Sequence, residues 1–503
     1  MRMKFPSKNY FIVSFLAVCF IYLAISLIFI NTLLPNCDEG WFTIPGYNLV
    51  EKGFFGTTVL DETATFRKVR LDGINQYTYW IMPLYPLSQG IWGKIVGFGL
   101  IETRLFSVVC GIFALISWFV LIRNLSENFN LALLSILLLA VDYHFIYASG
   151  FGRMDMLTTS LGIGALAVFT QLRNKNFDYA ILFSFTLTGL AFFAHPLGLI
   201  WFVSLAILII LLDSKRIRFK HLAFAGFPYL IFGLLWLTYI MQRPDLFFIQ
   251  FGGNASNRWA FFQAPFGEVW REIELRYFYN FGVGEGLSRA GQIRILILLF
   301  YFLAVIGALT TKSLRSRILP RFLLIIALQE FVMLLILDSM KQHYYLIYIT
   351  PTLIVILAIW VNSLWKQTTV FKCFAFGIVV SLVLINSSMF VSQFRRNDYQ
   401  INYLATADFL NQNIQENDSV TASAEFWFSL EKKENLTDDY RIGYLSGKQT
   451  KFVVLDEPRY KDWIKSLMAN DSVAYQNIQN ILHNHYEPIY RNDRYEVLKL
   501  KDK

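Results

Sequence analysis

The stretch Phe11–Ile30, FIVSFLAVCFIYLAISLIFI, contains twenty residues without a charge, and NTLLPNCDEG follows it at 31–40. A run of about 20 apolar residues is long enough to cross the hydrocarbon core of a bilayer as a helix. Arg2, Lys4 and Lys8 precede the run. The run is too long for the core of a cleaved signal peptide, and no small-residue cleavage site follows it. We therefore interpret Phe11–Ile30 as an uncleaved signal-anchor helix.

Similar apolar runs recur along the chain of 503 residues, of which 55% are hydrophobic and 16% are charged. A soluble domain usually carries about 25% charged residues, so the deficit indicates membrane helices. We predict a mainly α fold, a polytopic membrane helical bundle with about 11 transmembrane helices. The predicted helices begin near residues 11, 105, 130, 154, 178, 197, 222, 292, 322, 343 and 373.

The placement of Lys and Arg decides the topology. The further apolar segment Tyr79–Phe98 contains Pro83, Pro86, Gln89 and Lys94, which fits a broken interfacial or re-entrant segment better than a lipid-exposed span. With this segment not spanning and the amino terminus inside, thirteen Lys and Arg residues fall in inside loops, as the positive-inside rule requires. They are Arg123, Arg173, Lys175, Lys215, Arg216, Arg218, Lys220, Lys312, Arg315, Arg317, Arg321, Lys366 and Lys372.

The net charge of +9 is explained by these topology signals, so we expect the lipid bilayer and no nucleic acid as a partner. The four cysteines, Cys19, Cys37, Cys110 and Cys373, have neither metal-site nor disulfide spacing. An odd number of spans places the carboxyl terminus outside. We therefore expect a multi-pass protein of the plasma or inner membrane, with its functional side extracytoplasmic.

This topology divides the chain into two predicted domains. Residues 1–392 form the predicted transmembrane domain, with outer loops at about 31–104 and 242–292. Residues 393–503 form a predicted soluble extracytoplasmic α/β domain, which shows no catalytic signature and which we interpret as a lid or docking domain. Its predicted elements are strands at Asp418–Ser423 and Lys451–Asp456, a hairpin of Tyr486–Tyr490 and Arg494–Leu500, and helices at Ala405–Gln415 and Tyr460–Met468.

Acidic residues stand at the outer ends of two predicted spans. Asp38 and Glu39 follow the first span, and Arg153 and Asp155 mark the outer end of the fourth. A carboxylate at this depth is either solvated, paired or functional, and an anion near low-dielectric surroundings is a better base. At positions i and i+2 of a helix, Arg153 and Asp155 would point to different sides, so we expect each to have another partner.

Cationic residues lie on the same predicted face. His195 stands between the fifth and sixth spans, Arg258 in the second long outer loop, and Lys341 between the ninth and tenth spans. A hydrogen-bonded structural histidine, an interfacial anchor and a snorkelling lysine are the alternatives to phosphate binding. Together with Arg153, these residues are our substrate-binding candidates, because cations hold a phosphate while a carboxylate removes a proton from an incoming hydroxyl.

The loop that carries Arg258 also contains Phe266, Trp270, Ile273 and Tyr277 at helical spacing. Apolar residues at this spacing share one face of an α-helix. We therefore predict an amphipathic helix that lies in the membrane interface.

The order of these motifs resembles GT-C glycosyltransferases of the protein O-mannosyltransferase and aminoarabinose (lipid A) transferase type. That family has an Asp-Glu pair just after the first helix and a second Asp at the outer start of the fourth. It also has a Lys followed by aromatics and a Pro, as in Lys341-Gln342-His343-Tyr344-Tyr345 and Pro351. The resemblance covers roughly residues 10–390, and the tail resembles the aminoarabinose transferase arrangement more loosely.

The resemblance implies roles for individual residues. His195 stands where the family often has a Lys. Some members bind a metal through a Glu in the first outer loop, but no equivalent is found near residues 72–79, so no metal or other cofactor is expected. The implied roles are general base for Asp38, support of the base or orientation of the acceptor for Glu39, lining of the sugar or acceptor side for Asp155, and lipid-phosphate binding for Lys341 and Arg258 with Tyr345 nearby.

The expected function is transfer of a sugar from a polyprenyl-phosphate donor to a hydroxyl of a protein, lipid or glycan, with inversion at the anomeric carbon. The main alternative is a transporter or flippase of a lipid-linked or small solute. Inverted repeats and broken midplane helices are typical of such transporters. The sequence shows no such internal symmetry, and the long first outer loop and the large tail fit a transporter poorly. A non-catalytic scaffold would leave the convergence of Asp38, Asp155 and Lys341 unexplained.

Overall fold

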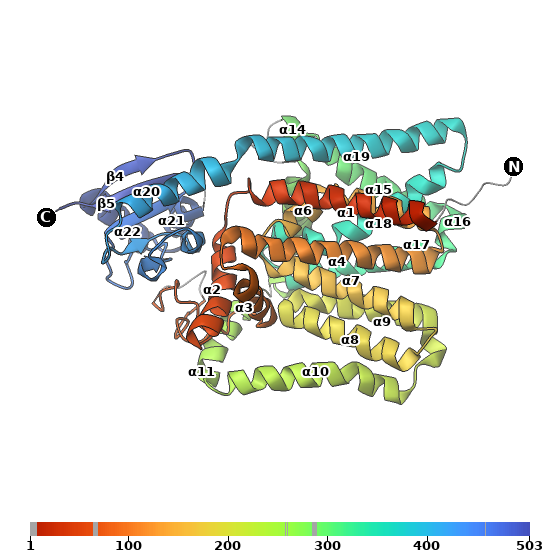
Figure 1. Ribbon diagram of the computed structural model, residues 1–503, viewed down its shortest axis with the longest axis horizontal. Coiled ribbons are helices and arrows are strands. Elements are labelled where there is room, and N and C mark those ends of the chain that lie inside the picture. Colours follow the sequence, from red (N-terminus) through yellow and green to blue (C-terminus); the bar gives the residue numbers. More distant parts are fainter. Residues whose placement is uncertain are drawn as a thin grey trace.

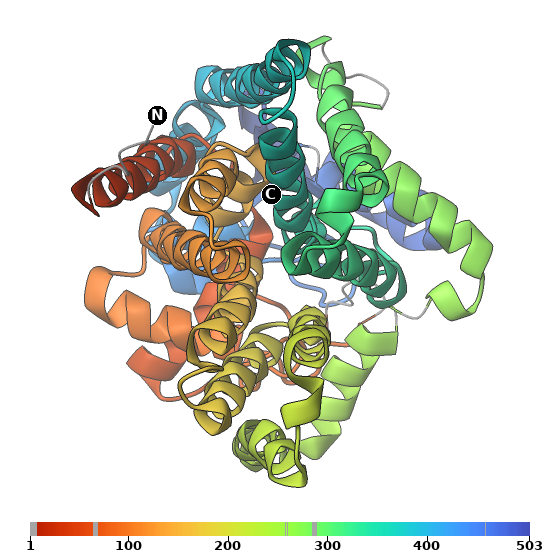
Figure 2. The same ribbon diagram turned by 90° about the vertical axis from the view of Figure 1, so that its right-hand side faces the viewer.

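The molecule is a bundle of helices with a small sheet-containing domain at one end, as the computed structural model shows (Figure 1). The structure describes residues 8–63, 69–256, 258, 260–283, 289–457 and 459–502. Figure 2 views the bundle from the end opposite the small domain, with most helices seen end-on. The first and last long helices of the bundle pack against each other, so the chain returns to its start before it enters the small domain.

A helix lies at each of the eleven positions predicted from the apolar runs, and one of them is a bent pair, α5 and α6. The helices are α1 (Lys8–Ile30), α4 (Leu100–Ser126), α5 (Phe129–Ala140), α6 (Tyr143–Ser149), α7 (Met154–Leu172), α8 (Phe177–Ala194), α9 (Leu199–Asp213), α10 (Phe219–Ile240), α15 (Ile295–Thr310), α17 (Ile318–Leu337), α18 (Thr350–Leu364) and α19 (Thr369–Arg396).

Within the described residues, seven helical stretches are long and apolar enough to cross a bilayer, and the pair α5–α6, bent by 67°, makes an eighth. Helices α15 and α18 are apolar but shorter. Helix α7 has Asp155 in its first turn and carries Thr158 and Thr159, which lower its apolarity. The chain is therefore an integral multi-pass membrane protein, and the count of eleven spans stays a prediction.

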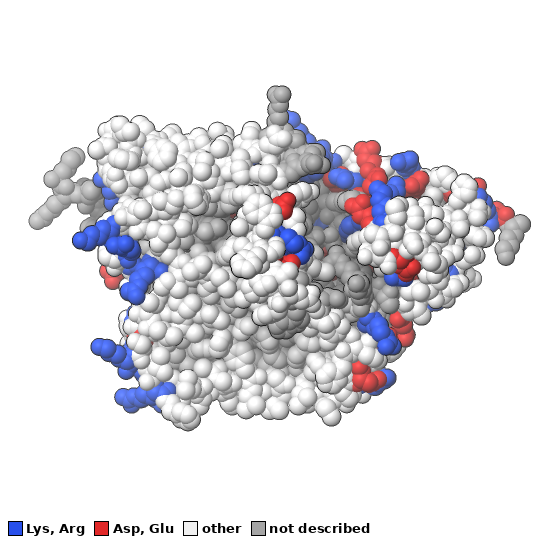
Figure 3. Space-filling view, turned by 180° about the vertical axis from the view of Figure 1, so that it is seen from behind, with Lys and Arg blue, Asp and Glu red and all other residues white. Residues whose placement is uncertain are grey.

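Charge is distributed unevenly along the bundle. Figure 3 shows Lys and Arg side chains at the end away from the small domain, a broad band almost free of charge, and mixed charges towards and over the small domain. Exposed apolar side chains such as Phe219, Leu235 and Phe302 belong to helices that cross the uncharged band. This pattern fits helices in a bilayer with polar regions on both sides.

The first long loop forms two short helices, α2 (Cys37–Lys52) and α3 (Leu84–Val96). Helix α3 has 13 residues and is not among the candidate spans, as predicted for this segment. The two helices approach closely at Gly46 and Gly90, because a Cβ on Gly46 would collide with the carbonyl oxygen of Pro86. Small residues at such a crossing allow the backbones to touch.

The second long loop departs from the predicted amphipathic helix. Its described residues between 244 and 278 contain three short α-helices and two π-helical stretches, and the exposed and buried side chains do not follow one face. Phe266 is 93% exposed and Trp270 60% exposed, whereas Tyr277 is buried. The π turns carry one more residue per hydrogen-bonded ring than an α-helix, which rotates the later side chains away from the earlier ones. The elements are α11 (Pro244–Phe247), Phe248–Gly252 (π), α12 (Gly253–Ser256), α13 (Pro265–Arg271) and Glu272–Phe278 (π).

The tail has the predicted α/β character. Its sheet has the strand order β2-β1-β3-β5-β4, with parallel pairs on one side of β3 and an antiparallel hairpin on the other. Alternate side chains of β3 face two separate cores, so helices cover both faces of the sheet. Helix α22 and strand β2 had no sequence prediction. The elements are α20 (Ala405–Asn413), β1 (Val420–Thr421), β2 (Leu436–Thr437), β3 (Phe452–Asp456), α21 (Arg459–Asn470), α22 (Ser472–His485), β4 (Tyr486–Arg491) and β5 (Tyr495–Leu500).

Replacement of Gly46 by alanine tests the contact between α2 and α3. The added methyl group meets backbone atoms, which cannot move aside as a side chain can, so we expect Gly46→Ala to lower the unfolding temperature by several degrees, equivalent to about 1–3 kcal/mol. Gly226→Ala in α10 is the control, because a Cβ there meets nothing within 4 Å. Thermal unfolding of both variants in the same detergent provides the comparison, and equal unfolding temperatures would contradict the close approach.

Candidate functional site

A cavity of about 470 Å³ lies where the bundle meets the small domain. Apolar and aromatic side chains form much of its wall, with a few polar groups directed inward, which is the usual composition of a ligand site. Its polar lining comes from the start of α2, the residue before α7, the turn between α8 and α9, the second long loop, the segment after α17 and the tail. These residues are Asn36, Asp38, Arg153, His195, Asn254, Arg258, Gln342, Tyr344, Tyr345 and Arg459.

Arg153 joins the two predicted acidic positions. Its guanidinium forms an ion pair with Asp38, and its Nε atom lies 2.9 Å from Oδ2 of Asp155. Each residue has another partner, as expected, because Arg153 pairs with Asp38 and Asp155 accepts from the Tyr348 hydroxyl at 3.4 Å. The expectation that the two side chains point to different sides is wrong, because they also pair with each other. Arg153 has an extended backbone (φ −129°, ψ 160°) as the N-cap of α7, so helical spacing does not apply to the pair.

The Asp38 carboxylate belongs to the cavity wall, whereas Asp155 lies behind it. Asp38 is 17% exposed and Asp155 3% exposed. The ring of Tyr344 stacks on the Arg153 guanidinium, whose Cζ atom is 4.1 Å from the ring centroid. Because an ion-paired carboxylate is present as the anion, Asp38 has lone pairs that can accept a proton.

A second polar group is formed by Arg258, Tyr345 and His195. The Oη atom of Tyr345 lies 3.4 Å from Nη1 of Arg258 and 3.4 Å from Nε2 of His195. The Nδ1 atom of His195 accepts a hydrogen bond of 3.1 Å from the N–H of Leu197. Burial, reinforced by the charges of Arg258 and Arg153, lowers the pKa of His195 well below its usual value. The neutral ring therefore carries its proton on Nε2.

This tautomer sets the direction of the Tyr345 hydroxyl. His195 Nε2 and Arg258 Nη1 both donate to the Tyr345 oxygen, so its lone pairs are occupied. Its own proton is then available to a ligand in the cavity. Arg258 has further N–H groups, because a guanidinium carries five donors. Together the two residues offer cationic and neutral donors of the kind that bind a phosphate ester.

Glu39 does not line the cavity. Its carboxylate is fully buried and pairs with Arg104, with Nε–Oε1 and Nη2–Oε2 distances of 2.8 Å each. Two backbone N–H groups also donate to it, from Gly152 at 2.9 Å and from Asn36 at 3.1 Å. This satisfied carboxylate lies behind Asp38, so of the two implied roles support of the base fits this arrangement, whereas direct contact with an acceptor does not.

Lys341 also lies outside the cavity wall. Its Nζ atom is 3.2 Å from carboxylate oxygens of both Glu268 and Glu272 and donates to the carbonyl oxygen of Leu335 at 3.0 Å. The backbone of Lys341 is in the left-handed region, with φ 54°. The expectation that Lys341 contacts the lipid phosphate does not fit this geometry.

The tail contributes a residue that sequence reasoning missed. Arg459, the first residue of α21, lines the cavity and donates through Nη2 to the carbonyl oxygen of Pro35 at 2.7 Å. Glu425 and Asp456 pair with the same guanidinium. An isolated Arg in a polar tail gives no sequence signal for such a role, because only the packing of the tail on the bundle brings it here.

Other features separate this cavity from the rest of the chain. Among the described residues, no group of three or more His, Cys, Asp or Glu side chains is placed to hold a metal ion.

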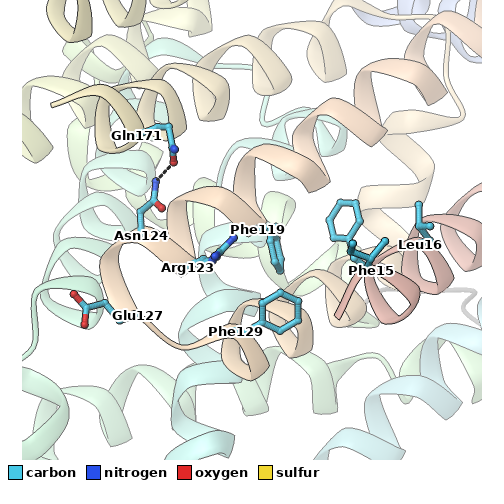
Figure 4. Close-up of a pocket in the computed structure, with 9 residues that line it drawn as sticks. Phe15, Leu16, Phe119, Arg123, Asn124, Glu127, Phe129 and Gln171 are labelled. Carbon is cyan, nitrogen blue, oxygen red and sulfur yellow. Dashed lines mark hydrogen bonds between the residues drawn. The ribbon is translucent and has the colours of Figure 1, made fainter. Parts of the chain in front are cut away.

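A larger hollow of about 840 Å³ lies at the opposite end of α4 (Figure 4). Arg123 and Glu127 line it, Asn124 donates to Gln171 at 3.0 Å, and the rest of its wall is apolar. The residues that line this hollow include no tyrosine, so the hollow does not repeat the arrangement of Asp38, Arg258 and Tyr345 in the first cavity.

The fold relates the chain to solved structures. It aligns with ArnT from Cupriavidus metallidurans bound to undecaprenyl phosphate at a TM-score of 0.58 and 13% identity, over 98% of both chains. It aligns with the Archaeoglobus fulgidus oligosaccharyltransferase tethered with an acceptor peptide at a TM-score of 0.59 and 13% identity, over 99% of this chain and 74% of that one. The chain thus shares its polytopic membrane fold with these two proteins.

The sequence comparisons are less informative. No family model matches the chain. One relative, an uncharacterized protein of Aquifex aeolicus, is 25% identical over 242 residues, which is 46% of this chain and 44% of that protein. The match therefore spans less than half of the relative's length. A fold at this level of identity leaves function to be argued from the site.

Replacement of Glu39 by glutamine tests its structural role. Glutamine cannot balance the buried charge of Arg104, and breaking a buried pair costs about 3–5 kcal/mol, so we expect a large drop in the unfolding temperature. Glu51→Gln removes one partner of the exposed pair with Lys94 and should cost at most about 1 kcal/mol. Thermal unfolding of the two variants would give equal shifts if Glu39 were not the buried partner of Arg104.

Proposed function

We propose that the chain is a membrane glycosyltransferase that transfers a sugar from a polyprenyl-phosphate-linked donor to a hydroxyl acceptor on the extracytoplasmic side. The observation that carries this proposal is the meeting of Asp38 with Arg258 and Tyr345 in one cavity. The solved structures with this fold include one bound to undecaprenyl phosphate and one with dolichol-phosphate. A carboxylate beside a phosphate-binding cation is the minimum that such a transfer needs.

The donor enters with its phosphate against Arg258 and the Tyr345 hydroxyl. Arg258 neutralises the charge that grows on the phosphate as the bond to the sugar breaks, and the Tyr345 proton adds a neutral hydrogen bond. His195 holds the Tyr345 oxygen from behind. The bond that breaks joins the anomeric carbon to the phosphate oxygen, and the polyprenyl phosphate departs as a stable phosphate monoester anion, so a strong general acid is not required.

Asp38 acts as the general base. It takes the proton from the acceptor hydroxyl while the oxygen attacks the anomeric carbon on the face opposite the phosphate, so the configuration inverts. Arg153, anchored by Asp155, keeps the Asp38 carboxylate charged and fixed in direction. In this account Glu39 and Lys341 are positioning residues, because neither lines the cavity.

The charge distribution supports the proposed sidedness. The inside face corresponds to the end of the bundle with the Lys and Arg side chains, and the cavity and the tail lie at the other end (Figure 3). Short loops rich in Lys and Arg are retained in the cytoplasm. The cavity therefore opens to the extracytoplasmic side, where hydroxyl groups of cell-envelope proteins, lipids and glycans are available as acceptors.

Lipid-phosphate binding gives a direct test of the phosphate site. We expect Arg258→Ala to weaken binding of undecaprenyl phosphate by about tenfold or more, since a hydrogen bond to a charged group contributes about 1.5–3 kcal/mol. Arg243→Ala in the same loop is the control, because Arg243 forms an exposed pair with Asp245. Binding of the purified protein in detergent can be measured by native mass spectrometry. Equal affinities in the two variants would place the phosphate elsewhere.

The catalytic proposal is tested in cells that lack the protein. We expect them to accumulate a polyprenyl-phosphate sugar, which the wild-type protein clears and Asp38→Asn does not, because loss of a general base slows transfer by about 10²–10⁴-fold. Asp72→Asn is the control, since Asp72 pairs with the exposed Arg70. Mass spectrometry of extracted lipids gives the readout. Clearance by Asp38→Asn would remove Asp38 as the base, and no accumulation in the deletion strain would favour a transporter.

A further inference from the structure

Helix α21 of the tail presents two side chains to the cavity, Arg459 and Trp463. They are four residues apart, so they lie on the same face of the helix. Two more tryptophans, Trp41 of α2 and Trp80 of the first long loop, line the same cavity. This part of the wall is therefore aromatic and belongs to three separate segments of the chain.

The tryptophan rings pack against one another as one aromatic cluster, in which Trp41 is 2% exposed and Trp463 is half-buried. The rings of Trp41 and Trp463 are stacked, with centroids 6.2 Å apart and an angle of 12° between their planes. Trp80 meets Trp41 edge-on, with centroids 5.6 Å apart and an angle of 70°. Trp41 is fixed further by donation of its Nε1–H to Asp438 at 2.9 Å. Rigid aromatic faces of this kind bind flat or weakly polar ring surfaces with little loss of side-chain entropy.

Arg459 adds a polar group with one unused donor. Its Nη2 atom donates to Pro35 at 2.7 Å and to Glu425 at 2.9 Å, and its Nε atom lies 3.1 Å from Asp456. Its Nη1 atom is buried and has no hydrogen-bond partner among the described residues. A buried donor without a partner is costly, so a ligand oxygen that accepts from Nη1 would be favoured.

The charges around Arg459 determine whether the ligand oxygen that accepts from Nη1 is neutral or anionic. Burial opposes the charge, but Glu425 and Asp456 raise the pKa of Arg459 well above its usual value. Glu425 and Asp456 already pair with the guanidinium, so this end of the cavity does not attract a further anion. A neutral hydroxyl, next to an aromatic surface, is the ligand group that fits both observations.

We propose that Arg459, Trp463, Trp41 and Trp80 form a carbohydrate subsite that holds a pyranose ring beside Asp38. The C–H face of the ring packs on the tryptophans, and a ring hydroxyl accepts from Arg459 Nη1. This inference rests on the proposed function and adds the substrate class. Pro35, the residue that Arg459 contacts, is three positions before Asp38, so the subsite adjoins the base. The ring is the sugar of the donor or that of a saccharide acceptor.

Saturation-transfer difference NMR of the full-length protein in detergent tests the subsite. The probes are methyl α-D-mannopyranoside, methyl β-D-glucopyranoside and methyl β-D-galactopyranoside. We expect at least one glycoside to bind the wild-type protein and its affinity to fall about 3–10-fold in Trp463→Leu, which keeps apolar volume but removes the aromatic face. Trp463→Phe should retain more of the binding. Trp270→Ala, at an exposed tryptophan outside the cavity, should bind as the wild type does.

Arg459→Lys tests the polar part, because lysine keeps a positive charge for Glu425 and Asp456 but has no Nη1 donor. We expect it to weaken glycoside binding while undecaprenyl phosphate still binds, which also reports that the variant is folded. Addition of the polyprenyl-phosphate sugar from the deletion strain to the NMR samples shows whether the subsite holds the donor sugar or a saccharide acceptor. A donor sugar in the subsite displaces the glycoside, whereas an acceptor subsite binds the glycoside together with the donor.

The proposal is overturned if no glycoside binds the wild-type protein, or if Trp463→Leu binds glycosides as well as Trp270→Ala does. Saturation of a serine-containing peptide instead of the glycosides would likewise reject it. Failure of the proposed function would give a different result, because the wild-type protein would then not bind undecaprenyl phosphate. The two failures can therefore be told apart in one set of samples.

Discussion

The buried ion pair between Glu39 and Arg104 holds together the segments that build the site. Arg104, near the start of α4, contacts both carboxylate oxygens of Glu39 and donates to the carbonyl oxygens of Ile30 and Leu33 at 2.7 and 3.0 Å. Glu39 in turn accepts from Gly152 at the entry to α7. The end of α1 and the starts of α2, α4 and α7 thus meet at one pair. Such a pair contributes little net stability, but its fixed geometry defines where the neighbouring residues lie.

Asp38 precedes Glu39 in sequence, and Arg153 follows Gly152, whose N–H donates to Glu39, so the contact between Asp38 and Arg153 follows from this pair. The tail extends the same arrangement, because Asp438 accepts from Trp41 and its N–H donates to Val59 at 2.7 Å. Arg459 reaches Pro35 just before α2. The tail is therefore hydrogen-bonded to the first long loop and contributes to the cavity wall, which is more than the cover expected from its sequence.

Sequence reasoning predicted the elements that depend on local patterns. Apolar runs such as Phe11–Ile30 identify helices because the bilayer requires length and apolarity in one continuous segment. The strand at Phe452–Asp456 and the hairpin after it follow from short apolar runs and a polar turn. Asp38, Arg153, His195, Arg258 and Tyr345 do lie in one cavity. Their catalytic and binding roles stay predictions.

The errors concern side chains whose partners are distant in sequence. Lys341 turns to Glu268 and Glu272, about seventy residues away, and no motif around Lys341 encodes that choice. Glu39 is next to Asp38, but its side chain does not line the cavity. The capping box with Asn36 and the ion pair with Arg104 fix its direction. The most direct measurement is a cryo-EM structure of the protein with undecaprenyl phosphate. The account predicts the phosphate against Arg258 and Tyr345 in the cavity that contains Asp38, and a phosphate bound at Lys341 or in the hollow beside Arg123 would contradict it.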